Sequence, residues 1–368
     1  MIYFDNSATT FYKPPEVINS VTNTLKFLSV NSGRSSHRLA MSGAKLIFNT
    51  REKVAQFVNC DSDKVIFTSG CTEALNLAIF GSKLSGNVVT TVAEHNSILR
   101  PLNELKKSGI ISITYCAHDE NSIIKAIKEN TCLVAVSHVS NVTGKCIDLD
   151  VIGNYCSKKG IKFLVDAAQS LGYKKVDMKK SKITFLASSP HKGLHAMQGI
   201  GFLACQTTKL SPLKFGGTGT SSLSLVQPTD MPEGFESGTL NMPGIVSLNT
   251  AINYTNHNFE ANRIKLTELH CYMIESLKCI KTLKIYSDLQ SMSGIISLNL
   301  PNYTSMEVAD ILNEQYDIAV RSGLHCAPLI HKYYGTDKIG MVRISLGIDN
   351  SYKEIDFFVS ALRELSAF

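Results

Sequence analysis

The pattern of apolar and polar residues repeats through the middle of the chain. Short runs rich in Val, Ile, Leu and Phe predict strands, and they lie at residues 65–68, 87–90, 111–114, 133–136 and 163–166. The segments between these runs carry apolar residues at helical spacing, and they include residues 73–80, 98–107 and 149–159. Repeated strand–helix units of this kind predict an α/β fold, in which helices sandwich a mostly parallel sheet.

The pattern changes towards the C-terminal end. Residues 242–280 have the spacing of one or two helices, and a compact α+β pattern follows them. Its strand-like segments are 294–298 and 341–345, and its helix-like segments are 305–315 and 352–365. A chain of 368 residues is long enough for about two domains. We predict a large domain of residues 15–255 and a smaller α+β domain of residues 1–14 and 256–368.

Composition and charge exclude several classes of protein. Hydrophobic residues make up 44% and charged residues 18% of the chain, which excludes a disordered chain. The net charge of +6 comes from scattered lysines and arginines, so nucleic acid is not an expected partner. No apolar run reaches the length of a membrane span, and the start lacks a secretory pattern. We therefore expect no membrane association and a cytoplasmic location.

The cysteines indicate neither a disulfide framework nor a metal site. The chain has ten of them, they lie far apart, and no C-x-x-C pair occurs. We expect most of these thiols to be small buried residues in a reducing compartment.

A lysine between two predicted strands is the most informative single feature. Residues 188–193, with the sequence SSPHKG, join the apolar runs 183–187 and 200–203. In a tight loop the amine of Lys192 can be desolvated, which lowers its pKa and makes it a nucleophile towards a carbonyl group. An exposed loop lysine explains the isolated segment at least as well.

Two further segments suit an anionic, ring-containing cofactor. The run 161–166 ends in Asp166 where the carboxyl end of a parallel strand is expected, and ligands of open α/β sheets collect at that edge. Residues 65–76 have the pattern strand, glycine turn, helix, which offers free N–H groups to a phosphate. Ordinary helix capping by Asp166, Ser69 or Thr72 is the alternative for each segment.

Taken together, these segments carry a family resemblance. With residues 93–97 and 138–144 between them, their order and spacing resemble the fold type I pyridoxal-phosphate enzymes of the class V aminotransferase family. The resemblance extends along the whole chain through residues 3–10, 31–37, 216–219, 235–241 and 321–329. The last of these segments, RSGLHCAPL, is similar to the catalytic cysteine loop of the group II cysteine desulfurases, which include selenocysteine lyases.

The resemblance implies a role for each matching residue. It makes Lys192 the lysine that carries pyridoxal 5'-phosphate, Asp166 the partner of the pyridine nitrogen and Gln169 the partner of the phenolic oxygen. It also implies ring stacking by His95, and catalytic roles for Lys192, Cys326 and His95. The remaining cofactor-binding residues are Cys71, Thr72, Asn141, Ser189 and His191, and the substrate carboxylate is assigned to Asn141, Arg321 and Arg343.

The chain departs from the family pattern at a few positions. Pro190 replaces a glycine before the lysine, which restricts the backbone at the expected phosphate site. Residues 193–198 lack the usual Gly-Pro, and residues 347–350 replace an aromatic-Asn-Thr pattern. None of these changes removes a reacting group.

The role of Cys326 distinguishes among the functions that the resemblance allows. We expect His325, His331, Arg321 and Arg343 to make its surroundings electropositive, which would lower the pKa of the thiol. The alternative is one more buried cysteine.

The resemblance favours a cysteine desulfurase that converts L-cysteine to L-alanine and leaves a persulfide on Cys326 for a sulfur-acceptor protein. Such an enzyme serves sulfur mobilisation, as in iron–sulfur cluster assembly. The resemblance also implies a homodimer, in which residues 216–222 of one subunit reach the phosphate of the other. The alternatives are a selenocysteine lyase or cysteine sulfinate lyase, another class V aminotransferase, and a non-catalytic scaffold that binds a sulfur carrier.

Overall fold

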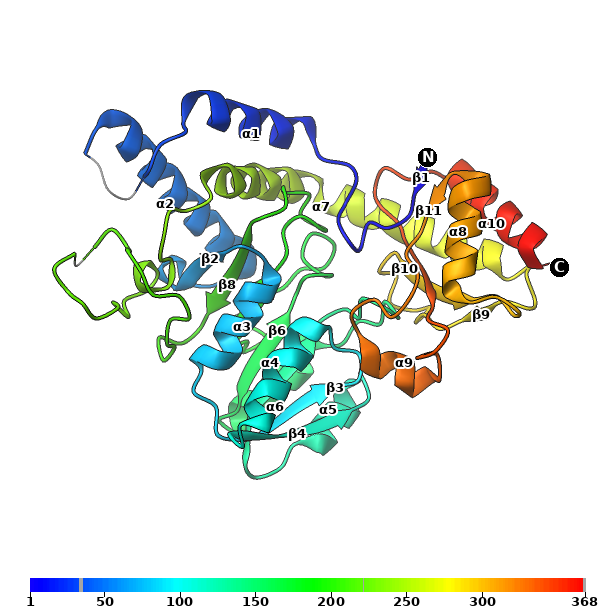
Figure 1. Ribbon diagram of the computed structural model, residues 1–368, viewed down its shortest axis with the longest axis horizontal. Coiled ribbons are helices and arrows are strands. Elements are labelled where there is room, and N and C mark those ends of the chain that lie inside the picture. The colour runs from blue at the N-terminus through cyan, green and yellow to red at the C-terminus, as the bar shows by residue number, and fades with distance from the viewer. Residues whose placement is uncertain (33–35, 221, 367–368) are drawn as a thin grey trace.

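A seven-stranded sheet forms the centre of the larger part of the molecule (Figure 1). The computed structural model describes residues 1–32, 36–220 and 222–366. The strands lie in the order β2-β8-β7-β6-β5-β3-β4. They are β2 (Val65–Thr68), β3 (Gly86–Thr91), β4 (Ile111–Cys116), β5 (Thr131–Ser137), β6 (Lys162–Asp166), β7 (Phe185–Ser188) and β8 (Gly201–Cys205). β8 is antiparallel to both of its neighbours, β2 and β7, and the other neighbouring strands of this sheet are parallel, so the predicted mostly parallel sheet is confirmed.

Helices cover both faces of this sheet. Along β5, Leu133 and Ala135 pack in one apolar cluster, whereas Val134 and Val136 pack in another. The first cluster includes α3 (Cys71–Gly81) and α4 (Asn96–Lys107). The second cluster includes α1 (Pro15–Phe27), α2 (Arg38–Val58), α5 (Glu120–Ala126), α6 (Leu149–Lys158) and the first part of α7 (Met242–Leu277). Successive strand residues point to opposite faces, so a strand buried on both sides shows a continuous apolar run, as the sequence does here.

The C-terminal part packs around a core of its own. It contains a three-stranded antiparallel sheet in the order β12-β10-β9 and a short parallel pair, β1 with β11. Its strands are β1 (Ile2–Tyr3), β9 (Lys284–Ile285), β10 (Ile295–Asn299), β11 (Ile318–Ala319) and β12 (Val342–Ser345). Its helices are α8 (Ser305–Tyr316), α9 (Pro328–Tyr334) and α10 (Tyr352–Ser366). The core unites Phe4 with Leu269, Ile296 and Phe358, so the N-terminal segment belongs to it.

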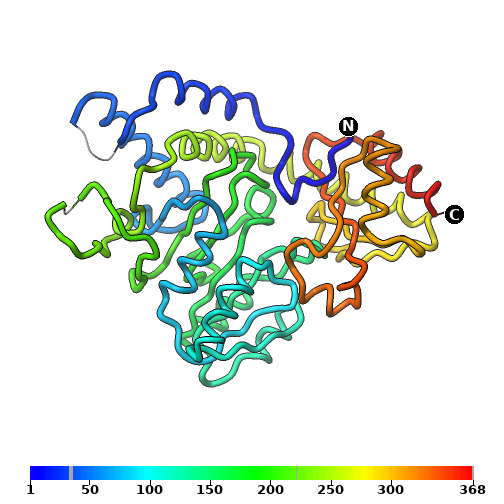
Figure 2. The backbone as a smooth tube through the Cα atoms, viewed as in Figure 1, coloured from blue at the N-terminus to red at the C-terminus, as the bar shows by residue number. Residues whose placement is uncertain are grey.

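The 36-residue helix α7 joins the two parts (Figure 2). Ile245 and Leu248 near its start lie in a core of the large sheet, and Leu266 and Leu269 further along lie in the C-terminal core. The segment 242–280 therefore forms one helix rather than two. The predicted boundary between residues 255 and 256 falls inside it and stays a prediction. Within the described residues, no helix has the length and apolar character needed to cross a membrane.

The expectation that most cysteines are buried is wrong. Three of the ten are buried and four are partly buried, whereas Cys271, Cys279 and Cys326 are exposed. Cys271 lies on α7 and Cys279 just beyond its end, whereas Cys326 lies in a loop.

Candidate active site

A cavity of about 230 Å³ lies where β5, β6 and β7 end, between the large sheet and the C-terminal part. Eleven of the twelve residues expected at the site line it: Cys71, Thr72, His95, Asn141, Asp166, Gln169, Ser189, His191, Lys192, Arg321 and Arg343. The twelfth, Cys326, lies on the exposed loop beside it, with its Sγ 3.7 Å from Nη2 of Arg321. The fold therefore gathers residues that are far apart in the sequence.

The parallel strands β6 and β7 bring Asp166 and Lys192 to the same edge. Asp166 is the last residue of β6, and Lys192 lies in the turn that follows β7. Oδ1 of Asp166 accepts hydrogen bonds from the backbone N–H of Ala168 (2.9 Å) and from the thiol of Cys71 (3.4 Å). Desolvation lowers the pKa of Lys192, and the negative charge of Asp166 opposes that shift. The amine is therefore more readily deprotonated, and so more nucleophilic, than a surface lysine.

Two helix N-termini meet across the cavity. The α3 residue Thr72 and the α4 residue Ser97 share a hydrogen bond between their hydroxyl oxygens (2.8 Å). His95 caps α4, because its Nδ1 accepts from the N–H of Ser97 at 3.1 Å. Burial lowers the pKa of His95, which favours the neutral form of its ring. Helix N-termini attract anions, which suits a phosphate group, and a neutral ring suits stacking on an aromatic cofactor.

Backbone pairing places two arginines side by side. The N–H of Arg343 donates to the carbonyl of Arg321 (2.7 Å), and the N–H of Arg321 donates back (3.1 Å). Arg343 is buried, and it donates to Oδ1 of Asp5 (2.7 Å) and to the carbonyl of Asn141 (3.1 Å). Its Nε has no partner among the described residues. The guanidinium thus keeps N–H donors for a carboxylate, the anion that its planar fork fits best.

The loop that carries Cys326 is fixed to the cavity wall. The N–H of Asn96 donates to the carbonyl of Cys326 (2.7 Å), and Nδ2 of Asn141 donates to the carbonyl of His325 (2.7 Å). His325 and Cys326 have φ values of 52° and 56°, a conformation that is unusual for residues other than glycine. This backbone leaves His325 buried and Cys326 exposed.

The expectation that histidines make the surroundings of Cys326 electropositive is wrong. The rings of His325 and His331 are stacked, with centroids 5.6 Å apart, and both residues are buried. Burial lowers the pKa of His331 to about 4 and that of His325 well below its usual value, so both are neutral at pH 7. A guanidinium group, that of Arg321, contacts the thiol instead. Sequence neighbours could not reveal that the two rings face inwards.

The N-terminal strap, which we define as residues 2–13, contributes to the cavity residues that were not expected there. Its Ser7 and Ala8 line the cavity, and the carbonyl of Ser7 accepts from Nε2 of Gln169 (3.0 Å). Asp5 pairs with Arg343, as described above. The polar segment 3–10 is part of the family resemblance, and its run of small polar residues is the signal that could have indicated a role.

Glu94 is a second residue that sequence analysis missed. Its buried carboxyl group accepts from the N–H and the hydroxyl of Ser137, at 2.7 and 2.8 Å, and thereby connects the start of α4 to the end of β5. Burial raises the pKa of Glu94 to about 8, so the carboxyl group is largely protonated at pH 7.

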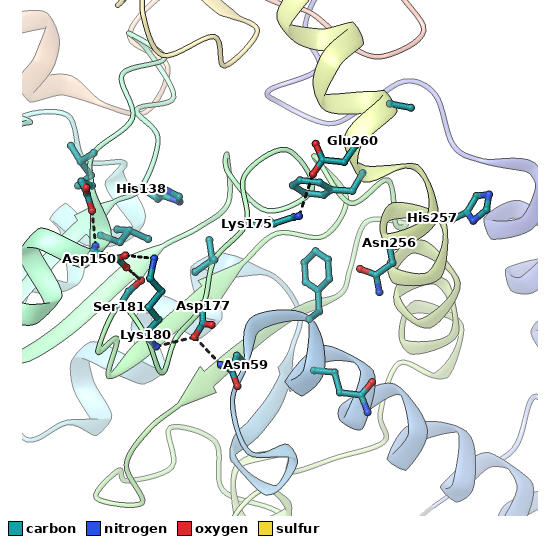
Figure 3. Close-up of a pocket in the computed structure, with 18 residues that line it drawn as sticks. Asn59, His138, Asp150, Lys175, Asp177, Lys180, Ser181, Asn256, His257 and Glu260 are labelled. Atoms are coloured by element: carbon teal, nitrogen blue, oxygen red, sulfur yellow. Dashed lines mark hydrogen bonds and ion pairs between the residues drawn. The ribbon is translucent and has the colours of Figure 1, made fainter.

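A larger cavity of about 780 Å³ contains none of the expected site residues (Figure 3). It lies among α2, α6, α7 and the residues 175–181. Its charged side chains pair with one another, as in Lys175–Glu260 (3.2 Å) and Lys180–Asp150 (2.5 Å). His138 lines this cavity, whereas its neighbours Ser137 and Val139 line the smaller one.

Parts of two motifs lie outside the described residues. They are Gly33, Arg34 and Ser35 in the segment 31–37, and Ser221 in the segment 216–222.

Comparison with known proteins supplies the family. Residues 2–358 match the family described as Aminotransferase class-V. Proteins described as probable cysteine desulfurases from Methanothermobacter thermautotrophicus and Pyrococcus abyssi are 33% and 34% identical, each alignment covering 99% of this chain and 94% of the relative. The apo structure of the cysteine desulfurase from Thermococcus onnurineus NA1 matches with a TM-score of 0.92 and 31% identity, over 100% of this chain and 94% of that one.

Proposed function

Because the chain belongs to the class V aminotransferase family and is a pyridoxal-phosphate-dependent cysteine desulfurase, we propose that Cys326 accepts the sulfur of L-cysteine as a persulfide and that L-alanine is released. The observation that supports this most directly is the attachment of the cysteine loop. Its carbonyls bind Asn96 and Asn141, so the exposed thiol is held beside the cavity that contains Lys192.

The residues of the cavity fit pyridoxal phosphate. Lys192 offers an amine of lowered pKa, Asp166 offers a carboxylate at the end of β6, and the N-termini of α3 and α4 offer polar groups to a phosphate. We propose that Lys192 holds the carbonyl carbon, Asp166 the pyridine nitrogen, Gln169 the phenolic oxygen and His95 the ring face. The remaining contacts are assigned to Cys71 and Asn141 and, at the phosphate, to Thr72, Ser189 and His191.

When bound, the cofactor supplies an electron sink for bonds broken at the α-carbon of the substrate. The amine of Lys192 would take the α-proton of L-cysteine and later return a proton to the product. Asp166 would hold the ring nitrogen in its protonated form. We propose that Arg343, together with Arg321 and Asn141, orients the substrate carboxylate.

Sulfur transfer is the step assigned to Cys326. Its thiolate attacks the sulfur of the bound substrate, so that an S–S bond forms as the substrate Cβ–Sγ bond breaks. The electron pair of the broken bond stays with the carbon skeleton, which takes up a proton and leaves as L-alanine. In sum, L-cysteine and the Cys326 thiol give L-alanine and a Cys326 persulfide. A thiol of an acceptor protein then attacks the persulfide and restores the Cys326 thiol.

We further propose a homodimer. Several large apolar side chains are almost fully exposed next to the segment 216–222, among them Phe215 (76%), Leu223 (102%) and Leu225 (104%). A stable isolated subunit rarely exposes such a group of apolar side chains. A second copy of the chain that covers them would explain their exposure, and it would agree with the expected contact between residues 216–222 and the phosphate of the other subunit. The use of a free catalytic thiol fits a reducing compartment, and the cytoplasmic location remains a prediction.

The test compares the parent protein with Cys326→Ala, supplied with L-cysteine and with L-selenocysteine. We expect the variant to lose alanine formation from L-cysteine but to retain more activity on L-selenocysteine, because selenium leaves more readily without attack by a thiolate. Parent-like alanine formation from L-cysteine in Cys326→Ala would contradict the persulfide step and favour an elimination or transamination enzyme.

A further inference from the structure

The turn that carries Lys192 is held from outside by the N-terminal strap. The carbonyl of His191, one residue before Lys192, accepts from the N–H of Thr10 (3.2 Å) and from the hydroxyls of Thr9 (3.3 Å) and Thr10 (3.1 Å). The hydroxyl of Thr10 also lies 3.2 Å from the carbonyl of Lys192. Within the turn itself, the N–H of Lys192 donates to Ser189 and that of His195 donates to Lys192.

Lys13 completes this set of contacts with a charged group. Its Nζ donates to the carbonyl of Thr10 (2.9 Å), to the hydroxyl of Thr10 (2.7 Å) and to the carbonyl of His191 (3.0 Å). An ammonium group has three N–H donors, so the three contacts use all of them. The mechanism gives Lys13 no other task, since it does not line the active-site cavity.

We propose that Lys13 is a positioning residue for Lys192, acting through the carbonyl of His191. The inference rests on the proposed role of Lys192 in the reaction. Charge-assisted hydrogen bonds are stronger than neutral ones, so the ammonium of Lys13 restrains the turn more than the hydroxyls of the strap do.

The other end of the strap explains why this restraint matters. Residues 2–3 pair with β11, and Asp5 pairs with Arg343, so the strap connects the C-terminal part to the turn of the large sheet (Figure 1). Lys13 therefore fixes the lysine relative to the arginine that is assigned to the substrate carboxylate. A proton at the α-carbon is taken efficiently only when both groups keep this spacing.

The charge of Lys13 is sensitive to pH in the alkaline range. Burial lowers its pKa to about 8, and the negative charge of Asp349 opposes the shift. The imidazoles that face Lys13, those of His191 and His195, have pKa values of about 4 and stay neutral from pH 7 to 9. Deprotonation leaves the amine two N–H donors for three acceptors, so the restraint weakens as the pH rises through 8.

The experiment measures amide hydrogen exchange of the turn in Lys13→Met, Lys13→Gln and the parent. The matched control is Lys26→Met, an exposed lysine in the last turn of α1. At pH 7 we expect the amides of Lys192, His195 and Ala196 to exchange about tenfold faster or more in Lys13→Met, the change for losing one charged hydrogen bond. The exchange rates in Lys13→Gln, which keeps two N–H donors, should lie between those in Lys13→Met and in the parent. The rates in Lys26→Met should equal those in the parent.

Two further readouts separate positioning from general instability. Amides of β5 serve as an internal reference, because a globally destabilised protein exchanges there as well. As the pH rises from 7 to 9, the exchange rates of the turn amides in the parent should approach those in Lys13→Met. In the enzyme loaded with cofactor, kcat should be lower for Lys13→Met than for the parent, while KM for L-cysteine changes little.

The proposal would be overturned if the turn amides of Lys13→Met exchanged at the same rate as those of the parent. It would also be overturned if their rates increased only by the same factor as the rates of the β5 amides. A constant ratio between the parent and Lys13→Met from pH 7 to 9 would also overturn it. Exchange does not depend on sulfur chemistry. Parent-like alanine formation from L-cysteine in Cys326→Ala would therefore refute the proposed function and leave the exchange result standing.

Discussion

The two cavities at the end of β5 differ in a way that identifies the active site. The cavity of about 780 Å³ is the larger, yet two of its lysines form ion pairs with its carboxylates, and it contains none of the residues expected at the site. The cavity of about 230 Å³ holds Lys192 with a lowered pKa, Asp166 at a strand end and Arg343 with an unpartnered Nε. The chemistry of the lining residues, rather than the volume of the cavity, therefore identifies the active site.

Lys192→Ala should produce the largest effect. Without its amine, the protein lacks both the cofactor attachment and the group that moves the α-proton, so alanine formation should fall about 10³-fold or more. The rate of alanine formation from L-cysteine measures this. Lys180→Ala, in the larger cavity, is the matched control, and equal losses in both variants would contradict the assignment.

Asp166→Asn should produce the second-largest effect on the reaction. An amide cannot keep the ring nitrogen protonated, so exchange of the substrate α-proton with solvent deuterium should slow about 10²-fold. Cofactor absorbance should persist, because Lys192 is unchanged. Exchange at the parent rate would show that Asp166 has another role.

His138, in the larger cavity, should affect stability rather than catalysis. Burial lowers its pKa to about 3, whereas an unfolded histidine titrates near 6.5. Below pH 6.5 the unfolded state therefore binds a proton that the folded state does not bind. The contribution of His138 to stability is complete above pH 6.5 and decreases as the pH is lowered towards 3. From pH 7 to pH 5 this one residue should lower the free energy of unfolding by about 2 kcal/mol.

Urea unfolding of the parent and His138→Asn at pH 7 and pH 5 checks this. The variant should lose less stability over that interval than the parent, with alanine formation unchanged at pH 7. An identical loss in both proteins would mean that His138 is not the neutral buried ring described above.

Arg343→Lys should have a smaller effect, confined to substrate binding. Lysine lacks the planar fork, so KM for L-cysteine should rise about tenfold, the cost of one charged hydrogen bond. Initial rates over a range of L-cysteine concentrations provide the measurement. A fall in kcat with KM unchanged would exclude a carboxylate-binding role.

The smallest effect is expected from Lys175→Gln in the larger cavity. Its pair with Glu260 is exposed, and water screens such pairs, so they contribute little to stability. The midpoint of urea unfolding should stay close to that of the parent, and alanine formation should not change. A large loss of activity would give the larger cavity a role that its paired charges do not suggest.

The repeating strands and most of the site could be predicted from sequence for related reasons. Runs such as 133–136 are apolar on both faces, and Asp166 and Lys192 follow strands whose parallel arrangement brings their ends together. The reversed strand β8 was not predicted, because an apolar run has the same pattern in either direction.

Contacts between distant segments could not be predicted in the same way. Nothing local to Lys13 shows that its amine reaches the carbonyl of His191, and nothing in the segment 321–329 shows that His325 turns inwards. Such contacts depend on how the strap and the cysteine loop pack against other elements. The electropositive surroundings expected for Cys326 were wrong for both histidines, because their rings are buried and neutral.

The most direct test of the central claim is the mass of the peptide that contains Cys326 after one turnover. The purified protein is mixed with one equivalent of L-cysteine without an acceptor thiol, quenched with an alkylating reagent and digested. The account predicts one additional sulfur atom on Cys326, in an amount that matches the L-alanine formed. Stoichiometric L-alanine with no additional sulfur on Cys326, or with the sulfur on another cysteine, would contradict it.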